Sequence, residues 1–159
     1  MCDLIYKEGK SLRGDIFSAR VLTEQLKDMA VLKVAIIGTN HYAKAFSFLA
    51  CGFNVSYFND NLEELMAFTQ EVELSNADIN RIALGMEVDF SAFDVVMDFS
   101  NMNSLDMITR LPAFSLDMKN TKQISALKTK AKELGASYMS YDDLLEKLTD
   151  KVYKEIVNK

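Results

Sequence analysis

Residues 33–43, KVAIIGTNHYA, join a β-branched apolar run to an immediate turn and then to the start of a helical pattern. The run 33–37 predicts a buried strand, because it is short, apolar and stopped at once by Gly38. Apolar residues then recur at helical spacing over residues 40–51, and FNVSYF (53–58) returns to strand. The stretch therefore predicts a βαβ unit, which almost always closes right-handed between two parallel strands.

The alternation of strand and helix continues to the end of the chain. Strands are predicted over 86–90, 93–99, 113–118 and 138–139, and helices over 61–69, 76–84, 103–111, 121–135 and from 141 onward. In front of the βαβ unit, residues 4–13 predict a hairpin that turns at Gly9, and residues 17–29 predict an amphipathic helix. This order favours an α/β fold, a doubly wound parallel sheet in a three-layer sandwich, with strand order 3-2-1-4-5-6 and residues 33–37 at its centre.

The composition limits the class of protein. A chain of 159 residues with 49% hydrophobic and 26% charged residues is one ordinary globular domain. The formal charge of −5 is opposite to what nucleic acid or an anionic membrane attracts, so neither is an expected partner. Cys2 and Cys51 have neither metal-ligand nor disulfide spacing, and residues 1–10 lack the basic start and apolar middle of an export signal. We therefore expect a cytoplasmic protein without a metal site.

The turn at 38–43 has the spacing of a dinucleotide-binding loop, G-x-G-x-x-A, except that Asn40 replaces the second glycine. In such a loop the first glycine allows a sharp turn, the second lets the backbone approach the pyrophosphate, and the small third residue lets helix and strand pack closely. Among residues other than glycine, asparagine tolerates positive φ best, so Asn40 would preserve the turn. Its side chain would, however, fill space near the phosphate. The candidate cofactor-binding residues here are Gly38, Thr39, Asn40, His41 and Ala43, with the pyrophosphate expected over the amides of 39–41. The alternative is a tight turn that binds no ligand.

Two acidic positions complete the predicted ligand crevice. Asp60 follows the strand 53–58, roughly 20 residues after the first glycine of the loop, where an acidic side chain binds the ribose 2′-hydroxyl. No Arg or Lys adjoins Asp60 in the sequence, so NAD is favoured over NADP, with Asn59 beside it in the site. Asp98 and Ser100 stand at the carboxyl end of the strand 93–99, the edge at which open α/β sheets bind ligands. In the alternative interpretation, residues 59–61 cap the helix that begins near Leu62, and Asp98 caps the next helix together with Ser100, Asn101 and Asn103.

Several local motifs resemble, in the same order, the C-terminal nucleotide-binding half of the shikimate dehydrogenase family. They are the hairpin LIYKEGK (4–10) followed by Gly14, the strand and turn KVAIIGTNHYAKA (33–45), the strand DVV (94–96), the pair Asp117-Met118, Thr121, Gly135 and the pair Leu144-Leu145. The resemblance covers nearly the whole chain. It implies one Rossmann-like nucleotide-binding domain over residues 1–159, with 1–32 packed on it as a hairpin and helix. If the chain is an enzyme, the resemblance implies an NAD(P)-dependent oxidoreductase.

The chain also departs from the family that it resembles. In that family the substrate is held mainly by an N-terminal domain that supplies a catalytic lysine, and this sequence begins after where that domain would end. The family aspartate falls on Asp15 when a two-residue gap is allowed and on Ser18 in the gapless register. The resemblance therefore implies Asp15 as the candidate catalytic residue, with Ser18 as the alternative occupant of that position. A substrate-binding glutamine is expected where Leu148 stands. We therefore expect that the chain alone does not reduce dehydroshikimate.

Two functions from different classes fit these residues. The first is an NAD(P)-binding domain with a small-molecule ligand, completed as an enzyme in a homodimer or by a separate catalytic-domain chain. The second is a non-catalytic interaction or regulatory domain that has lost dinucleotide binding. The first predicts an accessible crevice at Gly38 with Asp60 exposed, and the second predicts that Asn40, His41 and Tyr42 fill it.

Overall fold

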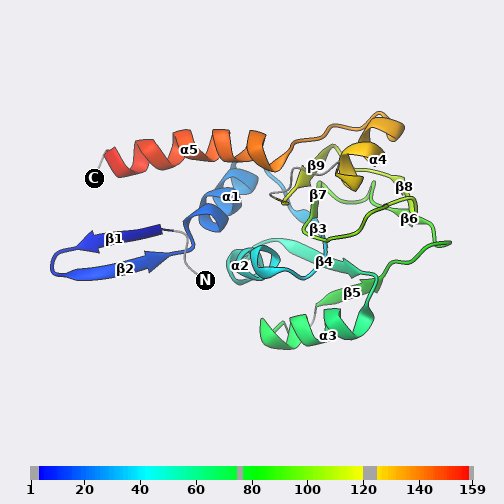
Figure 1. Cartoon of the computed structure of the whole chain (residues 1–159), viewed down its shortest axis with the longest axis horizontal. Helices are drawn as coiled ribbons and strands as arrows, with labels where there is room; N and C mark the ends of the chain where they lie inside the picture. The colour runs from blue at the N-terminus through cyan, green and yellow to red at the C-terminus, as the bar shows by residue number, and fades with distance from the viewer. Residues whose placement is uncertain (1–3, 75–76, 120–124, 158–159) are drawn as a thin grey trace.

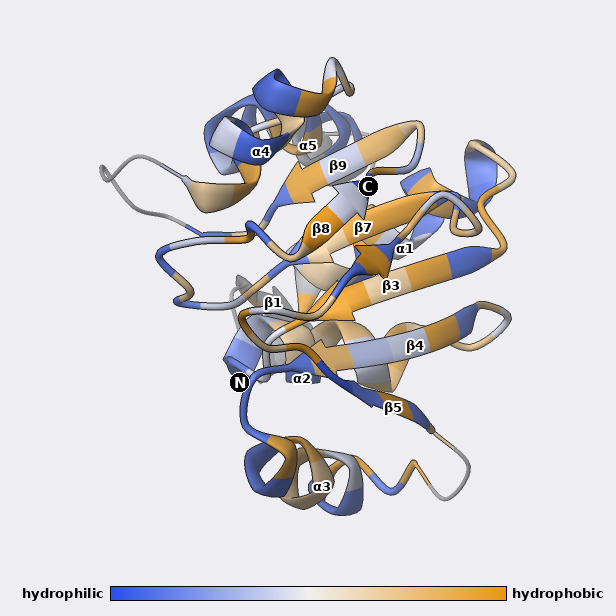
Figure 2. Ribbon diagram, turned by 90° about the vertical axis from the view of Figure 1, so that its right-hand side faces the viewer, coloured by the Kyte–Doolittle hydropathy of each residue, from blue (hydrophilic) through white to orange (hydrophobic). Residues whose placement is uncertain are grey.

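The structure is a computed structural model and describes residues 4–74, 77–119 and 125–157. Within these residues the centre is a five-stranded parallel sheet in the order β5-β4-β3-β7-β9 (Figures 1 and 2). The strands are β3 (Lys33–Ile37), β4 (Asn54–Asn59), β5 (Asp78–Arg81), β7 (Val95–Asp98) and β9 (Phe114–Asp117). Numbered along the chain, they have the order 3-2-1-4-5, and Met139 continues the sheet as a parallel bridge to Leu116. The predicted doubly wound order with β3 at its centre is therefore confirmed.

Helices cover both faces of the sheet, and the alternation of side chains along β3 explains why. Val34 and Ile36 pack in a core shared with helices α1, α2, α3 and α5, while Ala35 and Ile37 pack in a second core shared with α4. All four side chains are fully buried, as expected for a parallel strand covered on both faces. The helices are α1 (Phe17–Asp28), α2 (His41–Leu49), α3 (Leu62–Glu71), α4 (Ala126–Leu134) and α5 (Tyr141–Val157). This arrangement is the predicted three-layer sandwich.

Two predicted helices are wrong. Residues 76–84 contain strand β5 in place of a helix, while 75–76 lie outside the described residues. Ile79 and Ile82 pack into opposite cores and β5 pairs with β4, so pairing with a distant strand decides the conformation here. Residues 103–111 contain β8 (Ile108–Arg110), whose β-branched residues favour strand and which pairs with β6 (Val88–Asp89). The strand predicted at 86–90 therefore lies in this small separate sheet and outside the main one.

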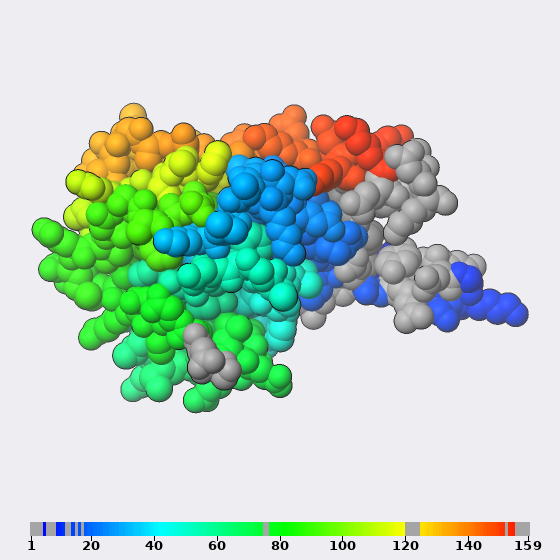
Figure 3. All heavy atoms as spheres, turned by 180° about the vertical axis from the view of Figure 1, so that it is seen from behind, coloured from blue at the N-terminus to red at the C-terminus, as the bar shows by residue number. Residues whose placement is uncertain are grey.

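The N-terminal segment forms the predicted antiparallel hairpin. Its strands are β1 (Leu4–Glu8) and β2 (Ser11–Asp15), and Gly9 lies in the turn with φ +60°. The hairpin projects from the body of the molecule, and the C-terminal half of α5 extends toward the same side (Figures 1 and 3). Helix α1 joins the hairpin to the sheet and contacts both α2 and α5.

A single carboxylate holds the amino ends of the two central strands together. Asp94 lies just before β7. Its Oδ2 accepts hydrogen bonds from the backbone amides of Lys33 and Leu32, with N–O distances of 2.8 Å each. These amides lower the pKa of Asp94, because they stabilise its charged form. The start of β3 is thus fixed to the start of β7 by residues 61 and 62 positions apart.

Candidate functional site

The turn between β3 and α2 brings Gly38 against the carboxyl end of β7. Gly38 is buried with φ +92°, and a Cβ at this position would lie 2.6 Å from the Ser100 amide nitrogen. The Gly38 amide also donates to the Phe58 carbonyl, at 2.8 Å, near the end of β4. Glycine is therefore required by the packing of three strand ends, whether or not a ligand binds.

Asn40 preserves this turn in a different way from the one predicted. Its backbone is extended, with φ −70°, so tolerance of positive φ plays no part. Instead its Oδ1 accepts the amides of Tyr42 and Ala43, both at 3.0 Å, and so caps α2. Two of the amides that a helix N-terminus offers to an anion are thereby satisfied within the chain. In the described part of the chain, the amides of Thr39, Asn40 and His41 have no acceptor.

Side chains around the turn differ in exposure. Ala43 is buried, as the small third residue of the loop should be, while Thr39 and Asn40 are half-buried. His41 and Tyr42 are exposed, and the Tyr42 ring lies 6.3 Å from the ring of Tyr141 at the start of α5. Of these side chains, Asn40 is the one that accepts hydrogen bonds from amides in the first turn of α2.

Asn59, the last residue of β4, is buried, and its side chain forms hydrogen bonds with Thr39 and with Asp60. Its side-chain amide donates to Thr39 Oγ1 at 3.5 Å, and its Oδ1 accepts the Asp60 amide at 3.0 Å. The Thr39 hydroxyl in turn donates to the Glu64 carboxylate. The helix cap predicted for this region is Asn61, whose Oδ1 accepts the Glu64 amide at 3.2 Å. The Asp60 carboxylate is exposed and has no partner among the described residues.

Arg81 was not predicted as part of this region. It is exposed at the end of β5 and lies in register with Asn59 on β4. A basic side chain therefore stands on the strand next to Asp60, although none adjoins it in the sequence. The signal that would have found it is the sequence DINR (78–81) assigned as a strand, because only sheet pairing brings residue 81 to residue 59.

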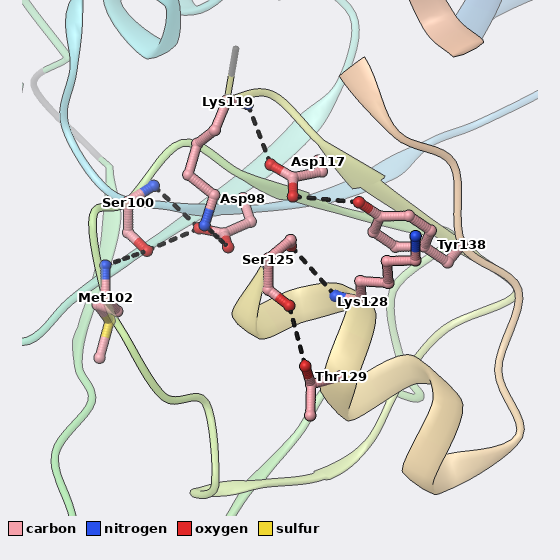
Figure 4. Close-up of polar contacts among 9 residues, drawn as sticks. All are labelled: Asp98, Ser100, Met102, Asp117, Lys119, Ser125, Lys128, Thr129 and Tyr138. Carbon is pink, nitrogen blue, oxygen red and sulfur yellow. Dashed lines mark hydrogen bonds and ion pairs between the residues drawn. The ribbon is translucent and has the colours of Figure 1, made fainter. Parts of the chain in front are cut away.

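Asp98 ends β7 and is fully buried (Figure 4). Its Oδ2 lies 2.6 Å from Lys119 Nζ, and its Oδ1 accepts the amide and the hydroxyl of Ser100 at 2.9 and 2.7 Å. Burial raises the pKa of Asp98, and the Lys119 ammonium and the Ser100 bonds partly offset this effect. Asp98 and Ser100 thus stabilise the turn after β7, and no helix begins there within the described residues.

Asp117 repeats this arrangement at the end of β9, in register with Asp98. Its Oδ1 accepts the Lys119 amide at 3.0 Å, and its Oδ2 accepts the Tyr138 hydroxyl at 3.2 Å. Burial raises the pKa of Tyr138 to about 12, and the adjacent Asp117 carboxylate adds to the effect. Figure 4 shows that these side chains gather above Ser125, the N-cap of α4.

Asp98 and Ser100 were identified from the sequence, but Lys119 and Tyr138 were not. The available signal was the shared spacing of D-x-S at 98–100 and D-x-K at 117–119, which places an Asp-capped turn after each strand. Thr121, predicted to begin the following helix, lies outside the described residues.

Ser18 and Leu148, two positions that were compared with family residues in the sequence, lie beside a small apolar pocket. Ser18, Tyr42, Phe99, Met118, Tyr141 and Leu148 are among the residues that line it. Its cavity volume is about 20 Å³, which is room for about one water molecule. Asp15 ends β2, and its side chain lies outside the described part of the structure.

The described residues were also compared with the requirements of a membrane-spanning helix and of a metal site. None of the helices in this set has the length and apolarity needed to cross a membrane. The set also contains no group of three or more His, Cys, Asp and Glu side chains suited to holding a metal ion.

The strand order of this parallel sheet reverses between β3 and β7, and a glycine turn follows β3 at that point. These two features define the doubly wound, Rossmann-like class of α/β proteins. Neither a protein-family model nor a curated protein sequence matches the chain. Its fold is similar to that of shikimate 5-dehydrogenase from Listeria monocytogenes, solved with shikimate and NAD, with a TM-score of 0.65 and 14% identity over 98% of this chain and 62% of that chain.

Two other solved structures are similar. Shikimate dehydrogenase from Mycobacterium tuberculosis has a TM-score of 0.64 and 12% identity, over 89% of this chain and 56% of that chain. The nucleotide-binding domain of glutamyl-tRNA reductase from Thermoplasma volcanium has a TM-score of 0.56 and 11% identity, over 89% of this chain and 98% of that chain. The chain thus spans less than two thirds of the length of these dehydrogenases, and the likeness shows the fold.

Proposed function

We propose that this chain is an NAD(P)-binding, Rossmann-like domain whose ligand lies at the carboxyl edge of the sheet. In this proposal residues 1–159 form one unit, with residues 1–32 packed on it. The observation that carries it is the β3–α2 turn, where Gly38 stands at the carboxyl end of β3, beside the point between β3 and β7 at which the strand order reverses. Structurally similar dehydrogenases were solved with NAD or with NADP, which supports a nicotinamide dinucleotide as the ligand class.

The proposed ligand follows the edge from β4 to β7. Its pyrophosphate lies over the amides of Thr39, Asn40 and His41, which have no acceptor within the described residues. Its adenosine ribose lies at Asp60, which is exposed at the end of β4. The residues assigned to the cofactor are Gly38, Thr39, Asn40, His41, Ala43, Asn59 and Asp60. Asp98 and Ser100, the other two positions expected from the sequence, hold the turn that lies against Gly38.

NAD is the preferred dinucleotide in this proposal. Asp60 is exposed, and Glu63 and Glu64 lie in the first turn of the helix that follows it. These carboxylates disfavour a 2′-phosphate, because like charges repel. Arg81 on the neighbouring strand opposes this effect, so we expect a moderate preference.

Calorimetric titration of the purified chain with NAD and NADP tests the site and the preference together. We expect NAD to bind more tightly, and Asp60→Ala to weaken NAD while weakening NADP less. Asp150→Ala, on an exposed position of α5, is the control. Failure of both dinucleotides to bind would contradict the proposed site, whereas tighter binding of NADP would contradict the preference alone.

As an enzyme, this domain would be an oxidoreductase completed by a homodimer partner or by a separate catalytic-domain chain. Asp15 is the proposed catalytic residue, on the family resemblance. Leu148 is buried and apolar, so it cannot donate a hydrogen bond to a substrate hydroxyl. Hydride transfer to a carbonyl needs a proton donor within about 2.6 to 3.2 Å of the oxygen. We therefore expect no reduction of dehydroshikimate by the chain alone, and turnover that disappears in Asp15→Ala would contradict this.

A second function is favoured because side chains of the protein itself form hydrogen bonds with groups of the β3–α2 turn that a ligand could otherwise bind. Asn40 accepts two amides of α2, and Glu64 accepts the Thr39 hydroxyl. A regulatory or interaction domain without a dinucleotide ligand is consistent with these bonds. The same titration separates the two functions, because this one predicts that neither NAD nor NADP binds.

A further inference from the structure

The carboxyl edge of the sheet has two halves, and the protein's own side chains occupy one half more completely than the other. In a doubly wound fold a dinucleotide places one nucleotide over each half, on either side of the switch point. Here one half lies over β4 and β5, and the other lies over β7 and β9.

Side chains over β4 and β5 are exposed and suit the adenosine part of a nucleotide. Asp60 is exposed and has no partner within the described residues, and Arg81 is exposed on the next strand. Leu62, at the start of α3, is 39% exposed, and Leu84, in the loop after β5, is 78% exposed. This half therefore offers a carboxylate to ribose hydroxyls and apolar side chains to a purine.

The half over β7 and β9 is occupied by the chain's own polar network (Figure 4). The side chain of Asp98 is fully buried and that of Lys119 is 9% exposed, and their charged groups lie 2.6 Å apart. Asp117 is buried and accepts the Lys119 amide and the Tyr138 hydroxyl. A nucleotide here would have to separate Asp98 from Lys119, which leaves a buried charge unpaired.

The apolar space beside this network is too small for a nicotinamide ring. The pocket lined by Tyr42, Phe99, Met118 and Tyr141 has a volume of about 20 Å³, whereas small-molecule sites measure roughly 300–1,000 Å³. Phe99 and Met118 directly follow the last residues of β7 and β9. The network and the small pocket therefore both lie in this half of the edge.

We propose that the chain recognises the adenosine diphosphate part of its nucleotide and gains no affinity from a second nucleotide. The ligand class is then adenosine diphosphate compounds, which include ADP, ADP-ribose and NAD. This inference rests on the proposed nucleotide site and narrows what that site recognises.

Calorimetric titration of the full chain with NAD, ADP-ribose, ADP and nicotinamide mononucleotide tests the inference. We expect NAD, ADP-ribose and ADP to bind within about threefold of one another, and nicotinamide mononucleotide not to compete with them. Binding of NAD tighter than that of ADP-ribose by about tenfold or more, or competition by the mononucleotide, would overturn the inference and leave the dinucleotide site standing. Failure of all four to bind would overturn both.

Leu62→Ser, with Met66→Ser as a matched control, locates the bound purine. Both residues lie on α3, 39% and 47% exposed, but Met66 lies one turn further along the helix. We expect Leu62→Ser to weaken ADP and NAD by the same factor, about fivefold, because both ligands lose the same apolar contact. Met66→Ser should change neither affinity. A larger loss for NAD than for ADP, or no loss for either ligand, would overturn the inference.

Discussion

Asp98 and Asp117 occupy paired positions at the carboxyl ends of β7 and β9, and one residue, Lys119, bonds to both of them. The Lys119 ammonium lies 2.6 Å from Asp98, while its amide donates to Asp117 at 3.0 Å. Each carboxylate also closes a turn by accepting the amide two residues later. The two strand ends are therefore joined through one residue, which gives its ammonium group to Asp98 and its backbone amide to Asp117.

Lys119→Met should destabilise the protein by about 3–5 kcal/mol, because Asp98 is left buried without its counter-ion. The double variant Asp98→Asn, Lys119→Met should lose less, since a neutral amide is buried at lower cost than a carboxylate. Urea unfolding of each variant measures the free energies. Lys132→Met, on an exposed position of α4, is the control. A loss below about 1 kcal/mol for Lys119→Met would show that solvent screens this pair.

Gly38→Ala and Gly52→Ala separate steric contact from backbone strain. Both glycines have positive φ, +92° and +97°, but a Cβ at Gly52 would meet nothing within 4 Å. Gly52→Ala should cost about 1–2 kcal/mol for its conformation alone. Gly38→Ala should cost about 1–3 kcal/mol more, because its methyl group meets the Ser100 backbone. Equal losses in thermal unfolding would show that the end of β7 can move away.

Tyr138 should make the protein less stable at alkaline pH. Its pKa in the folded state is about 12, against an ordinary value of 10.0. The unfolded chain therefore loses this proton first, and the free energy of unfolding falls as the pH rises from about 10 through 12. Tyrosinate absorbance and unfolding measured across this range check the effect. Tyr138→Phe should flatten the dependence and exposed Tyr153→Phe should not, so identical profiles for the two variants would refute this role.

Asn40→Gly should free two amides of α2 and raise the affinity for NAD, at a cost in stability of only a few tenths of a kcal/mol. Asn40→Asp keeps the cap but adds a negative charge beside the proposed pyrophosphate, so NAD should bind more weakly. Calorimetry on the two variants gives opposite shifts if the N-terminus of α2 belongs to the nucleotide site. No shift in either variant would remove this helix from the site.

Local sequence was sufficient for the centre of the fold. The run 33–37 is short, apolar and β-branched, and Gly38 ends it, so the strand, the turn and α2 follow from neighbouring residues. Strand β5 has no such pattern. Its four residues, DINR, are mostly polar and become a strand because they pair with 56–59. The mistaken helix also concealed the position of Arg81.

The network at β7 and β9 could be predicted only in part, for a related reason. Asp98 carries a positional signal at the end of an apolar strand, and so it was found. Lys119 and Tyr138 each lie 21 residues from the carboxylate that they bind, and their contacts depend on the pairing of strands and on the bridge at Met139. The pattern of apolar and polar residues within one segment does not show which residues of a distant segment it will contact.

Strand β7 supports β3 at both of its ends. At the amino end Asp94 accepts the amides that lead into β3, and at the carboxyl end the backbone of Ser100 fixes the space beside Gly38. The glycine turn is thus encoded in the first third of the sequence but is held in shape by residues well into the second half. A polypeptide cut between β5 and β7 would place the turn in one fragment and the residues that hold its shape in the other, so we expect the turn to form only when the two fragments associate.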